Sequence, residues 1–204
     1  MTLWECLYRT PTAEGDHCKY ATEYAKFGVN VYGPQDIADK KQFPFGKFTP
    51  LLVERTRKIG SFMVVPFANY HDTPIYGYLI NHPSMGTMLF STDSYKIGMT
   101  LRGIDHFLIE ANYEDSMLKE NVRNSSISKA QSDRIMLSHM SLNYCIEYLR
   151  DCEADKSAKT ITICHLSERN SNPKVFRDTV AGVFGIPTYI AHKGTIVELN
   201  KKEI

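Results

Sequence analysis

The sequence predicts a layered α/β fold, with residues 1–204 forming one domain. Short runs of β-branched residues alternate with amphipathic helical patterns, which is typical of such folds. The clearest unit is the strand pattern Thr160–Cys164, which ends abruptly at His165 and further polar residues before Asn172 and Pro173 open a helix. With 204 residues, 43% of them hydrophobic, the chain can bury one sizeable core or at most two small ones.

Composition narrows the environment in which the protein works. A net charge of +1 gives no broad basic footprint for nucleic acid or for a membrane surface. No stretch approaches the roughly 20 apolar residues of a membrane span, and the first residues do not resemble a signal peptide. The five cysteines are odd in number and show no CxxC spacing, which argues against a disulfide framework or a cysteine zinc site. We therefore expect a cytoplasmic protein.

The first half of the chain shows helix and strand patterns in succession. Tyr20, Tyr24 and Phe27 share one face of a helix that we expect over residues 17–27, and Gly28 ends it. The elements expected next are a strand at 29–32, a short helix at 34–41, an irregular loop at 42–50, a buried strand at 61–67, and a hairpin of strands 76–80 and 87–91.

The second half repeats the strand and helix steps. A strand at 106–109 is followed by a polar stretch at 120–133, which we expect to be mobile. Ser141 then caps a helix whose inner face carries Leu142, Cys145, Ile146 and Leu149. After the strand at 160–164 we expect a helix at 173–184 ended by Gly185, and closing strands at 187–190 and 195–199.

Side chains that bind metal ions or move protons fall repeatedly at the boundaries of these elements. They are Asp16, His17, His71, Asp93, Glu110, His139 and His165. Imidazoles and carboxylates without thiolates fit zinc or manganese, and a bridging carboxylate fits two metal ions about 3.5–4 Å apart that act in hydrolysis. The sequence therefore predicts a metal site.

The order of these motifs also resembles a known family. DH, then HD after a strand, then TDS, IEANY, SHMS and CHLSERN are similar to the motifs of metallo-β-lactamase-fold hydrolases, nearest to their phosphodiesterase branch. Within it the chain looks like the anti-Pycsar cyclic-nucleotide phosphodiesterases of phages and, somewhat less, like related exonuclease-type proteins. Glu110, His139 and His165 also parallel the HEAT, HST and terminal-histidine motifs of the zinc ribonuclease that trims tRNA precursors. The resemblance covers roughly residues 12–199.

The resemblance implies an αββα four-layer sandwich with one or two Zn²⁺ ions, or Mn²⁺. Asp16, His17 and His165 would hold one ion, His71 would belong to the other, and Asp93 would bridge them. Glu110 and His139 would form a proton-donating pair and, with Asp16, count as catalytic residues. The substrate implied is a small cyclic nucleotide.

The chain departs from the family pattern at its start. Where the family has HxHxDH, residues 12–17 read TAEGDH, so two histidines are missing. Only eleven residues precede Thr12, so we expect the first strands of the sandwich to be absent. A gene fragment or miscalled start, a natural truncation, and completion by a partner would each account for this. Loss of those strands should expose an apolar face over residues 29–32 and 61–67 and favour a homodimer.

Three functions remain open from the sequence. A cyclic-nucleotide phosphodiesterase fits the motif order, the near-neutral charge and the aromatic residues beside the ligands, Tyr70, Tyr95 and Tyr113, which can stack on a base. A nuclease would need a basic track, which is thin around Arg55, Arg57 and Lys58. The lost histidines favour the third possibility, a non-catalytic nucleotide-binding protein.

Overall fold

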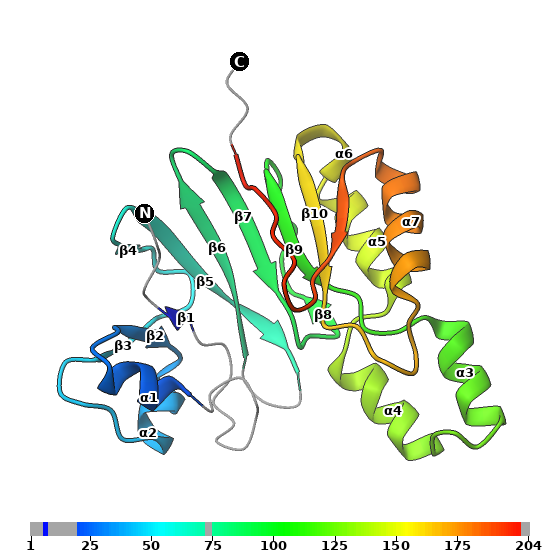
Figure 1. Ribbon diagram of the computed structural model, residues 1–204, viewed down its shortest axis with the longest axis horizontal. Coiled ribbons are helices and arrows are strands. Elements are labelled where there is room, and N and C mark those ends of the chain that lie inside the picture. Colours follow the sequence, from blue (N-terminus) through cyan, green and yellow to red (C-terminus); the bar gives the residue numbers. More distant parts are fainter. Residues whose placement is uncertain (1–5, 8–19, 72–74, 201–204) are drawn as a thin grey trace.

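The computed structural model describes residues 6–7, 20–71 and 75–200, which form two sheets with helices on their outer faces (Figure 1). The smaller sheet consists of the parallel strands β1 (Cys6–Leu7), β2 (Val31–Gly33) and β3 (Phe48–Pro50). Helices α1 (Ala21–Lys26) and α2 (Gln35–Lys40) pack on it through the buried residues Ala21, Ala25, Val31 and Ile37.

The larger sheet has the strand order β11-β10-β9-β7-β6-β5-β4, and β8 pairs with β5. Its strands are β4 (Arg57–Ile59), β5 (Phe62–Tyr70), β6 (Ile75–His82), β7 (Gly86–Ser91), β8 (Lys96–Ile97), β9 (His106–Glu110), β10 (Thr160–Cys164) and β11 (Thr188–Ile190). Because β6 is antiparallel to both of its neighbours, β5 and β7 run in the same direction, and β9 and β10 run parallel to β7. The carboxyl ends of these four strands therefore lie along one edge of the sheet.

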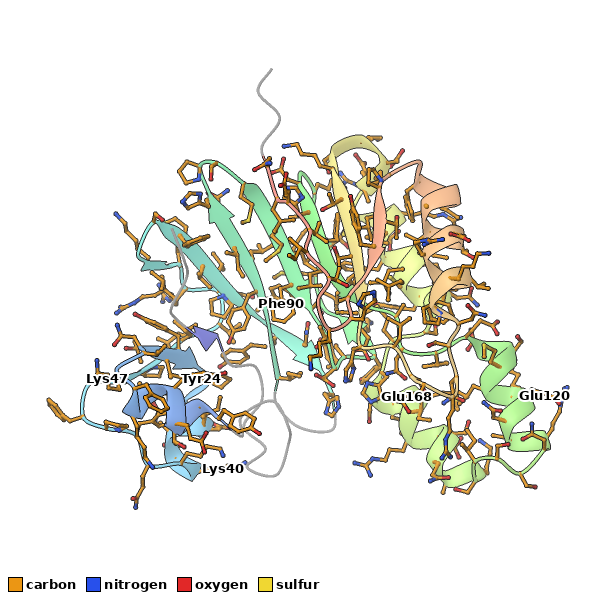
Figure 2. All side chains as sticks on the ribbon, in the orientation of Figure 1. Tyr24, Lys40, Lys47, Phe90, Glu120 and Glu168 are labelled. Carbon is orange, nitrogen blue, oxygen red and sulfur yellow. The ribbon has the colours of Figure 1, made fainter. Side chains whose placement is uncertain are left out.

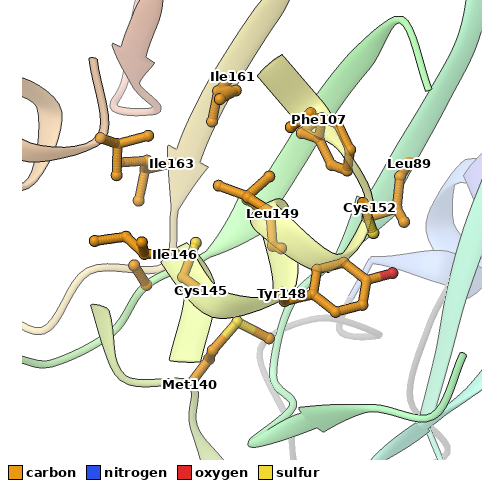
Figure 3. Close-up of a cluster of buried hydrophobic side chains, with 14 of the residues drawn as sticks. Leu89, Phe107, Met140, Cys145, Ile146, Tyr148, Leu149, Cys152, Ile161 and Ile163 are labelled. Atoms are coloured by element: carbon orange, nitrogen blue, oxygen red, sulfur yellow. The ribbon is translucent and has the colours of Figure 1, made fainter. Parts of the chain in front are cut away.

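The main core lies between the larger sheet and two helices, α5 (Leu142–Asp151) and α7 (Pro173–Phe184). Figure 3 shows Leu149 of α5 beside Phe107, Ile161 and Ile163, all of which are fully buried. Each such side chain contributes roughly 1.5–3 kcal/mol by leaving water. This core fixes the positions of β9 and β10, whose ends carry site residues.

The opposite face of the larger sheet packs against the smaller sheet. A second buried cluster joins Tyr32 of β2 to Val64, Tyr78 and Ile80 of β5 and β6. The order of layers is therefore helix, sheet, sheet, helix, which confirms the expected αββα class. Side chains alternate along each strand, so Phe107 and Ile109 of β9 face the helices while Glu110 faces the other side.

Several boundaries agree with the sequence. Ser141 caps α5 by accepting a hydrogen bond from the Tyr144 N–H, and Asn172 caps α7 in the same way. Gly185 ends α7 in the left-handed conformation, with φ of 68°, which glycine adopts without steric cost.

Other expectations were wrong. The stretch 120–133 is not a mobile loop, because α3 (Asp115–Arg123) and α4 (Lys129–Ser138) occupy most of it, and a capping box of Ser128 and Gln131 starts α4. Residues 195–199 form no strand, while β3 lies inside the expected irregular loop and β4 had no sequence signal. The short helix α6 (Ala154–Ser157) was also not expected.

The strands expected to expose an apolar face are covered in part, although Met63 of β5 is 41% exposed. Val31, Val64 and Phe67 are each at most 1% exposed. His106, which begins β9, is fully buried, and its ring nitrogens contact Thr160 Oγ1 at 2.8 Å and the Met85 carbonyl at 3.1 Å. Among the described residues, no helix is both long and apolar enough to cross a membrane.

Candidate metal centre

Four of the expected site residues lie where the co-directional strands of the larger sheet end. His71 follows β5, Asp93 follows β7, Glu110 ends β9, and His165 follows β10. Registers that pair Ser91 with Ile109, and Glu110 with Cys164, bring these strand ends side by side.

His139 reaches the same edge from the connection between α4 and α5. The Asn112 N–H donates to the Met140 carbonyl at 2.8 Å, and Tyr113 forms an isolated bridge with Ser141. These bonds hold the segment after α4 alongside the segment that leaves β9. His139 is therefore placed beside Glu110 by backbone pairing.

Glu110 is the hub of the site and is fully buried. Its Oε1 lies 2.8 Å from His139 Nδ1 and 3.0 Å from His165 Nδ1, and its Oε2 accepts a hydrogen bond from the Ser94 N–H at 2.9 Å. A carboxylate accepts, so each Nδ1 carries the proton, and Nε2 of each ring is left for a ligand or a substrate. The sequence paired Glu110 only with His139, and its contact with His165 was not foreseen.

Asp93 and His165 are poised around a shared positive charge. Asp93 Oδ1 lies 3.2 Å from His165 Nε2. In a neutral His165 ring the single proton is on Nδ1, so Nε2 is an acceptor and faces the acceptor oxygen of Asp93. Either a second proton on His165 or a cation between the two atoms satisfies this contact. Two neighbouring ligands of a tetrahedral Zn²⁺, each about 2.0–2.1 Å from the ion, stand about 3.3 Å apart. The observed spacing therefore fits a shared metal ion.

Two groups of potential ligands overlap at His139. The ligand atoms of His71, Asp93 and His139 lie within 4.8 Å of one another, and so do those of Glu110, His139 and His165. The His71 and His139 rings are 5.9 Å apart between centroids, and the His139 and His165 rings are 5.1 Å apart. One compact cluster of three imidazoles and two carboxylates results.

The backbone is strained at both residues of the Asp93 and His165 contact. Asp93 has φ of 51° and His165 has φ of 57°. These values lie in the left-handed region, which residues other than glycine rarely adopt. Strain of this kind persists where the surroundings fix it, and it concentrates at functional sites. Here the Asn112 side chain donates to the His165 carbonyl at 2.7 Å, and Thr92 Oγ1 donates to Asp93 Oδ2 at 3.2 Å.

Asn112 and Ser94 are site residues that the sequence did not identify. The Asn112 side chain donates to the His165 carbonyl, and its N–H donates to the Met140 carbonyl. The Asn112 carbonyl accepts a hydrogen bond from the Ser167 N–H at 2.9 Å. Asn112 thus ties the histidine-bearing segments to β9. The available signal was a polar residue two positions after a buried strand, in the IEANY motif.

The charge of Glu110 acts on two neighbouring acids. Burial, reinforced by this carboxylate, raises the pKa of the Cys145 thiol to about 12. Burial, with Asp115 and then Glu110, raises the pKa of the Tyr113 phenol to about 12. Neither group ionises near neutral pH, so imidazoles and carboxylates carry the chemistry. Tyr113 is only 6% exposed, which makes its expected role in base stacking wrong.

The structure thus brings His71, Asp93, Glu110, His139 and His165 together. Asp16 and His17, with Thr12 and Glu14, lie outside the described residues. The expected grouping of Asp16 and His17 with His165 therefore stays a prediction.

Comparison with known proteins gives matches to solved structures alone. No protein-family model matches the chain, and no curated protein matches it. YhfI of Bacillus subtilis, a metallo-β-lactamase fold protein, is similar with a TM-score of 0.72 and 15% identity, over 95% of this chain and 77% of that one.

Two further structures are similar over nearly the whole chain. The short form of human tRNase Z has a TM-score of 0.60 and 13% identity, covering 97% of this chain and 79% of that one. Yeast PDE1 has a TM-score of 0.60 and 13% identity, covering 93% and 67%. Likeness at such low identity establishes architecture alone, and it agrees with the layer order. The chain has the metallo-β-lactamase fold.

Proposed function

We propose that this protein is a metal-dependent phosphodiesterase that hydrolyses 3′,5′-cyclic nucleotides. The observation that carries the proposal is the Glu110 carboxylate, which holds His139 and His165 together beside Asp93 and His71. The names tRNase Z and PDE1, carried by proteins of the same fold, agree with phosphodiester chemistry. The motif order IEANY, SHMS and CHLSERN further supports an anti-Pycsar type of enzyme.

The donor set fits a divalent metal. Imidazole nitrogen and carboxylate oxygen without thiolate suit Zn²⁺ or Mn²⁺. Asp93 and His165 would share one ion, with Asp16 and His17 as expected further ligands, and His71 and Asp93 would hold a second. When bound, such an ion polarises a phosphoryl oxygen and brings the pKa of a water molecule towards neutrality.

His139 and Glu110 are assigned to the leaving group. Hydrogen bonding of Nδ1 to Glu110 orients the His139 ring and leaves Nε2 for the substrate. A protonated Nε2 can donate to the departing ribose oxygen while the carboxylate stabilises the imidazolium. General acid catalysis of this kind contributes roughly 10²–10⁴-fold.

The basic strand around Arg57 that a nuclease would use lies away from the site. Arg57 pairs with Val64 near the start of β5, whereas His71 follows the end of that strand. At about 3.3 Å per residue, this basic strand lies roughly 23 Å from the site. Lys40 and Lys47 lie beside the smaller sheet, at the end of α2 and just before β3 (Figure 2). These two groups therefore lie away from the strand ends, where Lys96 pairs with Tyr70.

The test is hydrolysis of cyclic AMP, GMP, CMP and UMP, beside a single-stranded oligonucleotide, with zinc or manganese supplied. His139→Ala should lower turnover by roughly 10²–10⁴-fold and leave the metal content unchanged. Asp93→Ala should lose metal and activity together, because its carboxylate belongs to the ligand set.

Three results would change the assignment. Parallel loss of metal and turnover in His139→Ala would make His139 a ligand. Cleavage of the oligonucleotide alone would identify a nuclease. A folded, metal-loaded parent protein without activity on either substrate would identify a non-catalytic binding protein.

A further inference from the structure

Two exposed tyrosines stand beside the metal centre. Tyr70, the last residue of β5, is 47% exposed and Tyr95 is 36% exposed, and their ring centroids are 6.1 Å apart with the ring planes inclined at 56°. Tyr70 directly precedes His71, and Tyr95 is the second residue after Asp93. The aromatic pair therefore occupies the same rim of the sheet as the candidate ligands.

The pair is held by a rigid backbone network. The Tyr70 N–H donates to Ser94 Oγ at 3.0 Å, and the Tyr95 N–H donates to the Tyr70 carbonyl at 3.1 Å. Ser94 is fully buried and also donates its own N–H to Glu110 Oε2 at 2.9 Å. A single residue thus links both tyrosines to the hub of the metal centre.

Gly98 sets the direction of the Tyr70 ring. A Cβ added at Gly98 would lie 2.8 Å from Tyr70 Cε2 and 3.3 Å from the Tyr70 hydroxyl oxygen. The ring therefore lies against the backbone after β8, in space that any larger residue would fill. Position 98 can be used to move the ring without altering a ligand.

Core packing does not account for these two rings. Neither is a member of the hydrophobic clusters formed by the described residues. Aromatic rings that stay exposed on a fixed backbone suit stacking, because a nucleobase covers their apolar faces without a cost in side-chain ordering. Stacking on an aromatic residue contributes roughly 1–3 kcal/mol per base.

We propose that Tyr70 and Tyr95 form a platform that holds the purine or pyrimidine ring of the cyclic nucleotide. This inference rests on the proposed phosphodiesterase function and adds the part of the substrate that is recognised. The platform holds the base while the strand-end residues act on the phosphate, and Ser94 keeps the two parts in register.

The test compares a cyclic nucleotide with methyl riboside 3′,5′-cyclic phosphate, which has the same ring phosphate and no base. Tyr70→Ala should lower the ratio of kcat/KM for the cyclic nucleotide to kcat/KM for the methyl riboside roughly 10-fold to 100-fold. Tyr70→Phe should keep the ratio of the parent because the ring remains, and Gly98→Ala should lower it because the ring is displaced. Tyr189→Ala is the control, because this tyrosine is 38% exposed and lies on the edge strand β11, which four strands separate from β5, the strand of Tyr70. It should match the parent on both substrates.

A binding measurement separates this inference from the proposed function. Calorimetric titration of the metal-loaded proteins uses the Rp phosphorothioate of cyclic AMP. If the parent binds this analogue but hydrolyses no substrate, and Tyr70→Ala binds it more weakly, the platform is retained and the phosphodiesterase is rejected. An unchanged substrate ratio in both Tyr70→Ala and Gly98→Ala would reject the platform while hydrolysis by the parent stands. A parent that neither binds nor hydrolyses would overturn both.

Discussion

Asp93 and His165 meet at 3.2 Å between side-chain atoms, and both residues adopt left-handed backbone conformations to do so. Each follows a buried strand, so the chain turns sharply at the point where its polar side chain enters the site. The candidate metal centre at this edge therefore coincides with local backbone strain, and the strain can be measured.

Replacing Asp93 by glycine should give a more stable protein than replacing it by alanine. The left-handed conformation costs residues with a Cβ about 1–2 kcal/mol, and glycine avoids this cost but loses part of the gain through its more flexible unfolded chain. Urea unfolding in the presence of EDTA should show Asp93→Gly ahead by up to about 1 kcal/mol. The same pair of changes at Lys96, in a strand with ordinary φ, should give the opposite order. Equal free energies of unfolding for Asp93→Ala and Asp93→Gly would show that the backbone at position 93 is not strained.

Glu110→Gln should weaken metal binding while the fold is retained. The amide keeps the shape of the side chain but cannot accept from both histidine rings and the Ser94 N–H as the carboxylate does. Loss of such an orienting group typically costs 10-fold to 100-fold in metal affinity, about the change we expect in a chelator competition. Glu168→Gln, at an exposed glutamate near His165, serves as the control and should bind metal like the parent.

Asn112→Ala should lower both stability and metal affinity. The amide group of the buried Asn112 donates to the His165 carbonyl, and its removal leaves that part-buried carbonyl without this donor. We expect a loss of about 1–3 kcal/mol in the free energy of unfolding, measured in EDTA. Asn143→Ala removes a comparable bond of 2.9 Å to Asp115 at an exposed position and should change neither quantity appreciably. Normal metal affinity in Asn112→Ala would show that His165 needs no such support.

Asp105 should make the stability of the protein depend on pH at the opposite end of the sheet. Burial alone would raise the pKa of Asp105, but hydrogen bonds from Lys159 and the Thr87 N–H, together with the Lys159 charge, lower it below the usual value of 3.8. With the pKa lower in the folded than in the unfolded state, the stabilisation is complete above the unfolded pKa and is lost as pH falls through the folded pKa.

The corresponding variant is Asp105→Asn. At neutral pH it should reduce the free energy of unfolding by about 1–3 kcal/mol. Urea unfolding from pH 7 downwards should show that the parent loses its extra stability over Asp105→Asn as the pH falls below the usual pKa of an aspartate carboxyl group. Asp151→Asn, at an exposed position, should follow the parent throughout. A constant difference between Asp105→Asn and the parent at all pH values would show that the carboxyl charge is not involved.

The sequence located the site because chain order and strand direction are partly readable from it. His71, Asp93, Glu110 and His165 each follow or end a β-branched or apolar run, and strands that run in one direction must end at one edge. The double contact of Glu110 was not readable, because it depends on the register that places Cys164 opposite Glu110. Register is set by packing of the whole sheet.

Misread elements have equally local reasons. The segment containing α4 is polar and was expected to be mobile, although Ser128 and Gln131 have the spacing of a capping box. Tyr113 follows a strand in the same way as the exposed aromatic residues do, but it packs with Leu118 and Ile127 under the α3 and α4 pair. Periodicity alone cannot distinguish a ring that a neighbouring helix covers from one left in solvent.

The attachment of His139 to α4 divides the candidate metal centre between a helical part and a sheet part. His139 is the residue at which α4 ends, and its N–H donates to the Ile135 carbonyl, while Leu118, Ile127 and Ile135 give the α3 and α4 pair a small core of its own. The other members of the cluster are carried by the sheet. A graft of a different helical pair of the same length, ending in the same histidine, would therefore change the surroundings of His139 and leave the strands that carry the other candidate ligands as they are.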